Sequence, residues 1–356
     1  MIKMKIAIHH RLGSFSERWI AYCEKQGIEY KIVNAYASDI VEQVRDCDAF
    51  MWHHHHADAK DNLFARQLLF SLQQAGKIVF PDFNTGWHFD DKVGQKYLFE
   101  ALGLPLVPSY VFYSVKEACE WCKETSYPKV FKLRGGAGSS NVCLVKNPRQ
   151  AKTLICKAFG RGFRPVNRWE IFCDSVKKRK WKPAMKSLLG FCFPQLMRES
   201  LIPKHKGYVY FQDFVPGMKF DIRVIVIGEK AFSIKRLCRE NDFRASGSGR
   251  IIYEKENQDA ACVKLAFCAA SAIGGKFGVP SLGFDFVLGD NDQPLLVEMS
   301  YGYDVHGYDP CPGYWTSDGI WHEGDFVPQQ WMVDWVRMVV LGNTLGGGTV
   351  CWKKDA

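Results

Sequence analysis

The first 80 residues alternate short apolar runs with longer amphipathic stretches. The apolar runs have the length of buried strands, and apolar positions in the stretches between them recur at helical spacing. Strands are expected at 5–9, 29–33, 49–52 and 78–80, and helices at 14–25 and 62–75. Ser14 or Ser16 is placed to cap the first helix. This alternation predicts a small parallel sheet covered by helices.

The pattern changes further along the chain. From Tyr127 to Val145, two β-rich runs flank a glycine-rich loop, which predicts an antiparallel hairpin. Residues 146–206 have no clear period, and we assign no elements to them. Elsewhere we expect helices at 91–101, 115–124, 259–277 and 329–341, and strands at 109–112, 209–214, 222–227, 230–236, 282–288 and 295–299. The fold class is therefore α/β at the start and α+β beyond it.

The size and charge of the chain refine this picture. At 356 residues it exceeds the usual single core, so more than one subdomain is expected. The formal charge is +9, and residues 157–206 hold 13 Lys and Arg against 3 Asp and Glu. The basic character thus belongs to one segment, densest at Lys177–Lys182. Two interpretations stay open, a solvated surface or a surface that contacts phosphate, acidic sugar or nucleic acid.

Other features of the composition point to the cytoplasm. No apolar run approaches the length of a membrane span, and the first residues alternate too strongly for a signal peptide. The 13 cysteines are odd in number and scattered, which favours reduced thiols. We expect a cytoplasmic protein.

The loop from Lys132 to Val142 contains three glycines and two serines. Glycines let consecutive backbone N–H groups face one concavity that can hold phosphate, although such a loop also serves as a plain hairpin connection. It is not a Walker loop, because no Gly-Lys-Ser/Thr follows. Lys132 precedes the loop and Lys92 begins an earlier helix, and either cation could pair with nucleotide phosphate.

Two acidic residues stand on consecutive predicted strands near the end of the chain. These are Asp285 and Glu298, and Ser300 lies two places beyond Glu298 and so faces the same side. Oxygen ligands on paired strands suit Mg²⁺, which prefers a few carboxylates together with phosphate and water. A magnesium site is therefore predicted on this pair of strands.

The order of these features from residue 90 to residue 300 resembles the ATP-grasp superfamily. The likeness is strongest to the branch of the ribosomal-protein glutamate ligases, and D-alanine–D-alanine ligase is a more distant relative. The motifs that carry it are Asp91-Lys92, Lys132, the 135–141 loop, Gln212-Asp213-Phe214-Val215, Asp221-Ile222-Arg223, and Asp285 with Glu298 and Ser300. The resemblance implies a Rossmann-like domain over 1–84 and two α+β lobes, 85–206 and 207–356, that enclose a nucleotide.

The resemblance also implies a role for each matching residue. Lys92 and Lys132 would reach the ATP phosphates, main-chain groups of the hinge at Asp213, Phe214 and Val215 would contact adenine, and Asp221 would bind the ribose. A mobile flap would close over the phosphates with Gly135, Gly136, Gly138, Ser139 and Ser140. The implied catalytic residues are Arg223, Lys235, Arg236 and Arg244, and the implied metal ligands are Asp285, Glu298 and Ser300. Ser300 departs from the family's usual Asn, and Asp213 from its usual Glu.

The implied activity is an ATP-dependent carboxylate–amine ligase that uses Mg²⁺ or Mn²⁺. It would form an acyl phosphate and release ADP and phosphate. Its expected partners are a small carboxylate and an amine, and we do not expect nucleic acid. An acidic glycan of polysaccharide biosynthesis and a homodimer are further hypotheses. A kinase of the same fold, and a catalytically idle nucleotide-binding module for an anionic polymer, remain as alternatives.

Four consecutive histidines, His53–His56, follow a predicted strand. They lie at a carboxyl end, where open α/β sheets bind ligands. We interpret them as a loop that faces the substrate, with metal binding as the alternative.

Overall fold

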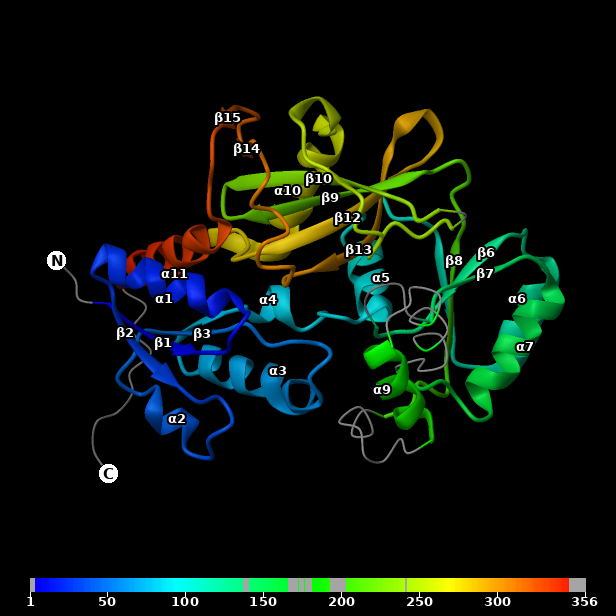
Figure 1. Cartoon of the computed structure of the whole chain (residues 1–356), viewed down its shortest axis with the longest axis horizontal. Coiled ribbons are helices and arrows are strands. Elements are labelled where there is room, and N and C mark those ends of the chain that lie inside the picture. The colour runs from blue at the N-terminus through cyan, green and yellow to red at the C-terminus, as the bar shows by residue number, and fades with distance from the viewer. Residues whose placement is uncertain are drawn as a thin grey trace.

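A computed structural model of the chain describes residues 4–136, 141–165, 172, 176, 181–192, 203–240 and 242–345. Its strands form three sheets. Figure 1 shows one at the lower left, one across the top and one at the right. We call them, with their helices, the N-terminal, C-terminal and central lobes.

The N-terminal lobe is the expected small parallel sheet. Its strands run in the order β2-β1-β3-β4, and every pairing is parallel. The elements are β1 (Lys5–His9), α1 (Phe15–Gln26), β2 (Glu29–Val33), α2 (Ile40–Gln43), β3 (Ala49–Trp52), α3 (Ala59–Gln74), β4 (Ile78–Phe80) and α4 (Phe83–Gly86). Ser14 caps α1, as predicted. Helix α3 begins before residue 62 because Asp58 caps it by accepting the Lys60 N–H.

The central lobe is an antiparallel sheet of order β5-β8-β6-β7. Its elements are β5 (Ser109–Phe112), α6 (Val115–Glu124), β6 (Lys129–Lys132), β7 (Cys143–Val145), α7 (Pro148–Phe159) and β8 (Val209–Asp213). The β6–β7 pairing confirms the expected hairpin. Strand β8 pairs with both β5 and β6, so chain beyond residue 206 completes this sheet. A further helix, α9 (Trp181–Cys192), lies within the basic segment.

The C-terminal lobe is a seven-stranded sheet, in which β13-β12-β9-β10-β14-β15 are neighbours and β11 pairs with β10. Its elements are β9 (Phe220–Ile227), β10 (Lys230–Leu237), β11 (Ile251–Ile252), α10 (Ala260–Gly274), β12 (Leu282–Leu288), β13 (Pro294–Ser300), β14 (Gly313–Thr316), β15 (Trp321–Glu323) and α11 (Pro328–Leu345). Helix α5 (Lys92–Ala101) buries Phe99 in the core of this lobe. The mixed α/β and α+β class is as predicted.

The N-terminal and C-terminal lobes share one hydrophobic core. Ile6 and Trp19 of the first pack in the same cluster as Ile225, Phe232 and Val336 of the second. In Figure 1, α11 lies along α1. The central lobe has a separate core, which contains Phe131, Ile155 and Phe211. The N-terminal and C-terminal lobes are thus joined through a common core, which the central lobe does not share. Within it, no helix combines the length and apolarity needed to cross a membrane.

Candidate functional site

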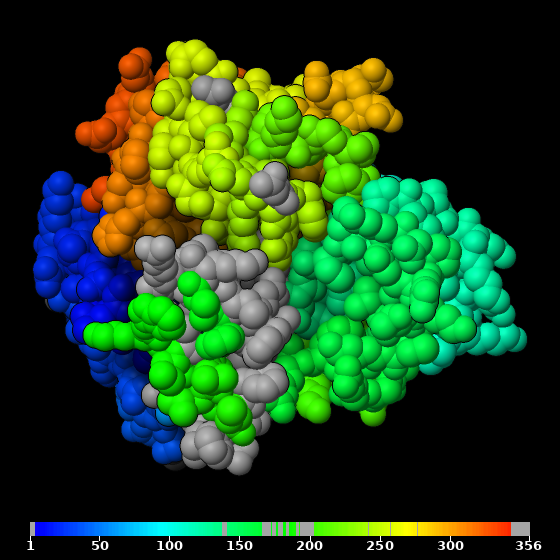
Figure 2. All heavy atoms as spheres, turned by 45° about the vertical axis from the view of Figure 1, so that its right-hand side comes forward, coloured from blue at the N-terminus to red at the C-terminus, as the bar shows by residue number. Residues whose placement is uncertain are grey.

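A cavity of about 580 Å³ lies where the three lobes meet. The space-filling view shows the central lobe in green and cyan beside the yellow C-terminal lobe (Figure 2). Of the residues predicted for the site, the cavity is lined by Lys92, Lys132, Gly136, Asp213, Phe214, Val215, Asp221, Arg223, Arg244, Asp285, Glu298 and Ser300. The structure therefore brings together residues from elements far apart in the sequence.

Lys92 stands at the first position of α5, which Asp91 caps by accepting the Gly94 N–H. Its Nζ lies 3.1 Å from Glu298 Oε1 and donates to the Gly136 carbonyl over 2.9 Å. Burial alone would lower the pKa of Lys92, but Glu298 and Asp90 raise it above its usual value. Lys92 is therefore protonated and positively charged at neutral pH.

Lys132 ends β6 and is just as deeply buried, but its surroundings differ. Its Nζ donates to Gln212 Oε1 over 2.6 Å. No carboxylate of the described residues lies within ion-pair distance of it. Burial lowers the pKa of Lys132 to about 8. This ammonium thus lacks a close counter-ion in the protein, and an anion in the cavity would stabilise its charged form.

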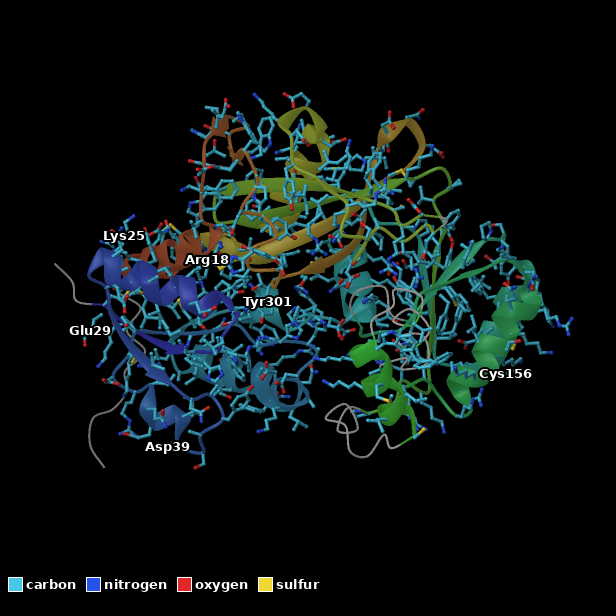
Figure 3. The ribbon with its side chains drawn as sticks, viewed as in Figure 1. Arg18, Lys25, Glu29, Asp39, Cys156 and Tyr301 are labelled. Carbon is cyan, nitrogen blue, oxygen red and sulfur yellow. The ribbon has the colours of Figure 1, made fainter. Side chains whose placement is uncertain are left out.

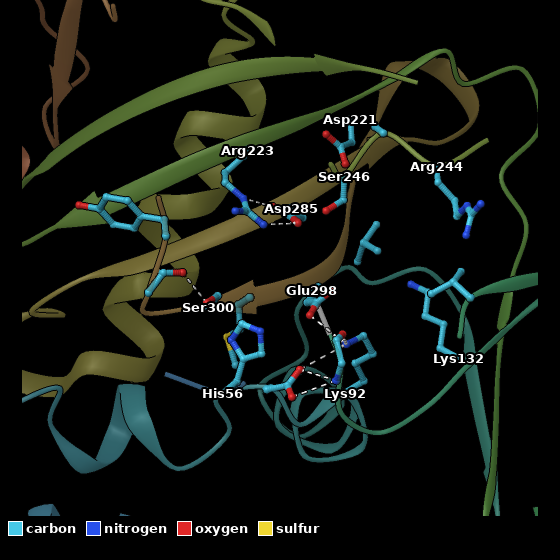
Figure 4. A pocket seen from close by; sticks show the side chains of 18 of the residues that line it. His56, Lys92, Lys132, Asp221, Arg223, Arg244, Ser246, Asp285, Glu298 and Ser300 are labelled. Atoms are coloured by element: carbon cyan, nitrogen blue, oxygen red, sulfur yellow. Dashed lines mark hydrogen bonds and ion pairs between the residues drawn. The ribbon is translucent and has the colours of Figure 1, made fainter. Parts of the chain in front are cut away.

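Asp285 and Glu298 face each other across β12 and β13. They are direct partners in the antiparallel register, beside a bulge between Asp285 and Phe286. Ser300 follows on the same face, and its hydroxyl donates to the Gly302 carbonyl over 2.7 Å. Figure 4 shows Glu298 between Asp285 above it and Lys92 below it, with Ser300 to the left. Two carboxylates and a hydroxyl provide the oxygen donors that a hard cation prefers.

Two arginines form ion pairs with Asp285. Arg223 Nε and NH2 lie 2.5 and 2.7 Å from its two carboxylate oxygens, and Arg236 NH2 is 2.9 Å from one of them. Arg236 also forms a bidentate pair with Asp221, at 2.7 Å for both bonds. Burial would raise the pKa of Asp285, but the charges of Arg223 and Arg236 outweigh it and hold the pKa below its usual range.

The described residues hold no cluster of three or more His, Cys, Asp or Glu side chains spaced to bind a metal ion. A cation at Asp285 and Glu298 would therefore depend on further oxygen donors, such as Ser300 and a ligand's phosphate. It would also have to displace Arg223 from Asp285.

Part of the cavity wall is apolar. Val107, Val130, Met218, Phe220 and Val287 line it, next to the strand-to-loop segment 212–215. The Asp213 carboxylate is 2.5 Å from Lys129 Nζ, which anchors the end of β8 to β6. The Val215 N–H makes no hydrogen bond among the described residues and is open to a ligand. An apolar slot with a free backbone donor suits a flat heterocycle.

Some predicted residues lie elsewhere. Lys235 does not line the cavity, because alternation along β10 places it opposite Arg236, and its Nζ lies 4.5 Å from the centre of the Phe220 ring. Arg236 lies behind Asp221 and Asp285 without lining the cavity. Arg244 does line it and pairs with Asp242 at 2.7 Å. Gly138, Ser139 and Ser140 lie outside the described residues.

Gly135 marks a contact that the sequence did not reveal. A Cβ at this position would lie 2.9 Å from the carboxylate of Asp90, whose oxygens accept the Gly136 N–H. Asp90 lines the cavity and has a positive φ of 55°. It stands directly before Asp91-Lys92, so the two consecutive acids Asp90-Asp91 were the sequence signal that could have pointed to this contact.

The histidine loop faces the cavity, as expected. His53, His55 and His56 line it, together with Arg11 from the loop after β1. His54 is buried, and its carbonyl accepts the Tyr301 hydroxyl. Arg11 gave no signal in the sequence, because only the fold places it beside residues 53–56.

Comparisons with known proteins support the architecture. No protein-family model and no curated protein sequence matches the chain. D-alanine–D-alanine ligase from Bacillus anthracis, complexed with ATP, matches 98% of this chain and 100% of its own, at TM-score 0.57 and 11% identity. A RimK domain ATP-grasp protein from Sphaerobacter thermophilus matches 94% and 99%, at 0.52 and 15%. Biotin carboxylase from Campylobacter jejuni matches 93% and 70%, at 0.56 and 15%. At such low identity, the likeness establishes the fold alone.

Proposed function

From the ATP-grasp fold of this chain, we propose that the protein is an ATP-dependent ligase that joins a carboxylate to an amine and releases ADP and phosphate. The cavity would hold the nucleotide, a divalent cation and the acid at once. Its volume of about 580 Å³ is in the range of small-molecule sites.

The observation that carries the proposal is the pair of buried lysines. Lys92 and Lys132 come from different elements and line one cavity, and Lys132 has no carboxylate beside it among the described residues. A buried cation without a counter-ion is costly unless a ligand supplies the negative charge. The triphosphate of ATP is such a ligand, and similar structures were solved with ATP or with MgADP.

The two ends of the cavity orient the nucleotide. Adenine would lie in the apolar slot against Val107 and Val130, within reach of the Val215 N–H. The phosphates would then lie toward Lys92, Lys132 and the Gly136 backbone. The glycine-rich loop would close over them, which keeps water from the reacting groups.

Asp285, Glu298 and Ser300 would hold Mg²⁺ or Mn²⁺, because they present oxygen donors side by side on β12 and β13. The ion supplies positive charge at the transferring phosphoryl oxygens. Arg223 and Arg236 keep Asp285 ionised. Arg223 would have to leave Asp285 for an ion to bind there, and its guanidinium would then be free to face the substrate anions.

The reaction proceeds in two transfers. A carboxylate oxygen of the acid attacks the γ-phosphorus, and the bond to the β,γ-bridging oxygen breaks as ADP leaves. The amine nitrogen then attacks the acyl carbon, the bond to phosphate breaks, and the nitrogen loses a proton. Lys92, Lys132 and Arg244 offset the negative charge that gathers in the first step.

A test that requires no knowledge of the amine uses hydroxylamine as the acceptor. Purified protein is incubated with Mg-ATP, hydroxylamine and a panel of carboxylic acids, and ADP, AMP and hydroxamate are measured. We expect ADP and hydroxamate in equal amounts. Glu298→Gln should abolish turnover, whereas Glu323→Gln, a matched change at an exposed residue of β15, should not.

Other products would identify other functions. AMP in place of ADP contradicts an acyl phosphate. A stable phosphorylated product that forms without any amine indicates a kinase. Tight nucleotide binding without turnover on any acid indicates an idle module.

A further inference from the structure

The cavity extends beyond Glu298 and Ser300 into the N-terminal lobe. This part is lined by Arg11 and Gly13 from the loop after β1, and by His53, His55 and His56 from the loop after β3. In Figure 4, His56 lies beside Ser300, across the pocket from Lys132 and Arg244. None of these residues belongs to the part of the cavity that we propose for the nucleotide.

The topology of the sheet explains why a compartment forms here. In the order β2-β1-β3-β4, the chain leaves β1 toward one side for β2 and crosses to the other side for β3. The loops after β1 and β3 therefore diverge at the carboxyl edge of the sheet. Such a switch point leaves a crevice in which open α/β sheets bind ligands.

The walls of this crevice are held in place before any ligand binds. The Arg11 NH2 group donates to the His53 carbonyl over 3.4 Å, and the Phe15 N–H donates to His53 Nδ1 over 3.2 Å. Asp61 accepts the His55 N–H over 2.6 Å and lies 3.6 Å from Arg11 NH1. Because Asp61 also accepts the Tyr36 hydroxyl, its charge is shared among three groups. Arg11 keeps part of its guanidinium exposed to the cavity.

Arg11 is the cation of this compartment. Burial lowers the pKa of both His55 and His56 to about 4, so their rings are neutral at pH 7. Neutral imidazoles offer a hydrogen bond and a flat surface, but no charge. Among the described residues of the N-terminal lobe that line the cavity, Arg11 alone is charged at that pH. Its planar guanidinium can donate two parallel hydrogen bonds to the two oxygens of a carboxylate.

Arg11 and the groups at the reacting end of the cavity have different partners. The Arg11 NH2 group donates to the His53 carbonyl, and its NH1 group lies 3.6 Å from Asp61. Lys92 instead lies 3.1 Å from Glu298. The His55 and His56 rings also line the cavity and stack with centroids 4.3 Å apart. Arg11 is thus tied to the N-terminal lobe and not to the groups that would handle the reacting carboxylate.

We infer that the acid substrate carries a second carboxylate, several bonds from the reacting one, and that Arg11 binds it at the β1/β3 crevice. This inference rests on the proposed function, because it assigns the reacting carboxylate to the end of the cavity at Lys92 and Glu298. The substrate class is then a dicarboxylic acid, and Arg11 determines specificity without taking part in either bond-forming step.

The test compares succinate, glutarate and adipate with their monoamides in the hydroxamate assay. At least one diacid should have a KM about tenfold or more below that of its monoamide, as expected for a charge-assisted pair. Arg11→Gln should raise the KM for that diacid by a similar factor, change kcat less than about twofold, and leave the monoamide unaffected. Arg45→Gln removes an exposed arginine of the same lobe and should behave as the wild type.

Calorimetry with the same acids and a non-hydrolysable ATP analogue separates this inference from the proposed function. Diacid binding that Arg11→Gln weakens, without turnover of any acid, supports the subsite and overturns the ligase. Hydroxamate from acids and monoamides with equal KM, or equal losses for both in Arg11→Gln, overturns the subsite and leaves the ligase standing. Absence of diacid preference in both assays overturns the subsite as well.

Discussion

At the residue scale, Lys132 is the side chain whose charge state depends most on what occupies the cavity. Because burial lowers its pKa to about 8, the free protein releases this proton as the pH rises past 8. Nucleotide binding favours the protonated form and raises the pKa again. We therefore expect the Kd for ATP to be flat below pH 8 and to rise about tenfold per pH unit above it. Titrations of nucleotide binding between pH 6.5 and 9.5 measure this.

Lys132→Arg is the matched variant for that experiment. Arginine stays protonated throughout the range, so the rise above pH 8 should disappear. A rise of the same size in Lys132→Arg would show that another group is responsible.

Ser300 permits a second prediction at this scale. Its side chain is short, and the hydrogen bond that its hydroxyl donates to the Gly302 carbonyl restricts where its oxygen lone pairs can point. Asparagine would extend a carbonyl oxygen toward Glu298 on the same face of β13. We expect Ser300→Asn to lower the Mg²⁺ concentration for half-maximal turnover by roughly threefold to tenfold. Mg²⁺ titrations at saturating ATP measure it, and Ser300→Ala should shift the midpoint in the opposite direction.

The sequence predicted individual site residues unevenly. The alternation of strands was enough to place Asp285, Glu298 and Ser300 on one face, and the structure has them there. The bidentate pair of Arg223 with Asp285 joins residues 62 positions apart, and no local pattern reveals it. Lys235 and Arg236 looked alike in the sequence, yet the alternation of β10 directs only Arg236 toward Asp221.

At the element scale, the start of α5 and the end of β6 are locked together. Asp90 accepts the Gly136 N–H, the Lys92 N–H donates to the Arg134 carbonyl over 2.8 Å, and Arg134 Nε donates to Asp91 over 2.8 Å. The glycine-rich loop is thus attached to the helix that carries Lys92. Any change at this attachment should alter both phosphate-binding elements.

Gly135→Ala tests that attachment. The new Cβ would lie 2.9 Å from the Asp90 carboxylate, which cannot retreat without losing the Gly136 N–H. We expect the KM for ATP to rise by about tenfold, with a melting temperature within a few degrees of the wild type, since the site is a loop. Unchanged ATP kinetics would show that the loop does not need this anchor.

Elements were predicted best where apolar periodicity was strong. Strands β1, β2, β3, β5 and β12 have the predicted bounds. Helix α7 was not assigned, although Asn147 caps it and Pro148 opens it, a start signal in a stretch of weak periodicity. Strands β14 and β15 were also missed, because both are short and they join the sheet through the long-range pairing of β14 with β10. The division at residues 84 and 206 stays a prediction.

At the scale of the whole molecule, Tyr301 joins two lobes. It lies between the N-terminal sheet and β13 (Figure 3), and its hydroxyl donates to the His54 carbonyl. Tyr301→Phe keeps the packing but leaves that buried carbonyl unpaired, which should destabilise the protein by about 1–3 kcal/mol. Urea unfolding measures it. Tyr97→Phe, at an exposed residue whose hydroxyl bonds to Tyr113 and to no other described residue, should cost less.

The separation of the cores leads to a prediction about dynamics. The N-terminal and C-terminal lobes share a core, whereas the central lobe has its own. We expect amide exchange in β6 and β8 to slow when a nucleotide binds, with little change in β1 and α11. Hydrogen exchange with and without an ATP analogue tests this, and uniform slowing across all lobes would contradict an independent response of the central core.

Two backbone hydrogen bonds define a point about which the central lobe could rotate. Between α5 and β5, the Val107 N–H donates to the Leu296 carbonyl and the Leu296 N–H donates to the Pro105 carbonyl, both over 2.9 Å. The central lobe is thereby fastened to β13 two residues before Glu298. This point lies near Glu298, whereas α6 and α7 lie on the outer side of the central lobe, away from it (Figure 1). A rotation of the lobe by a few degrees about this point would move α6 and α7 much farther than Glu298.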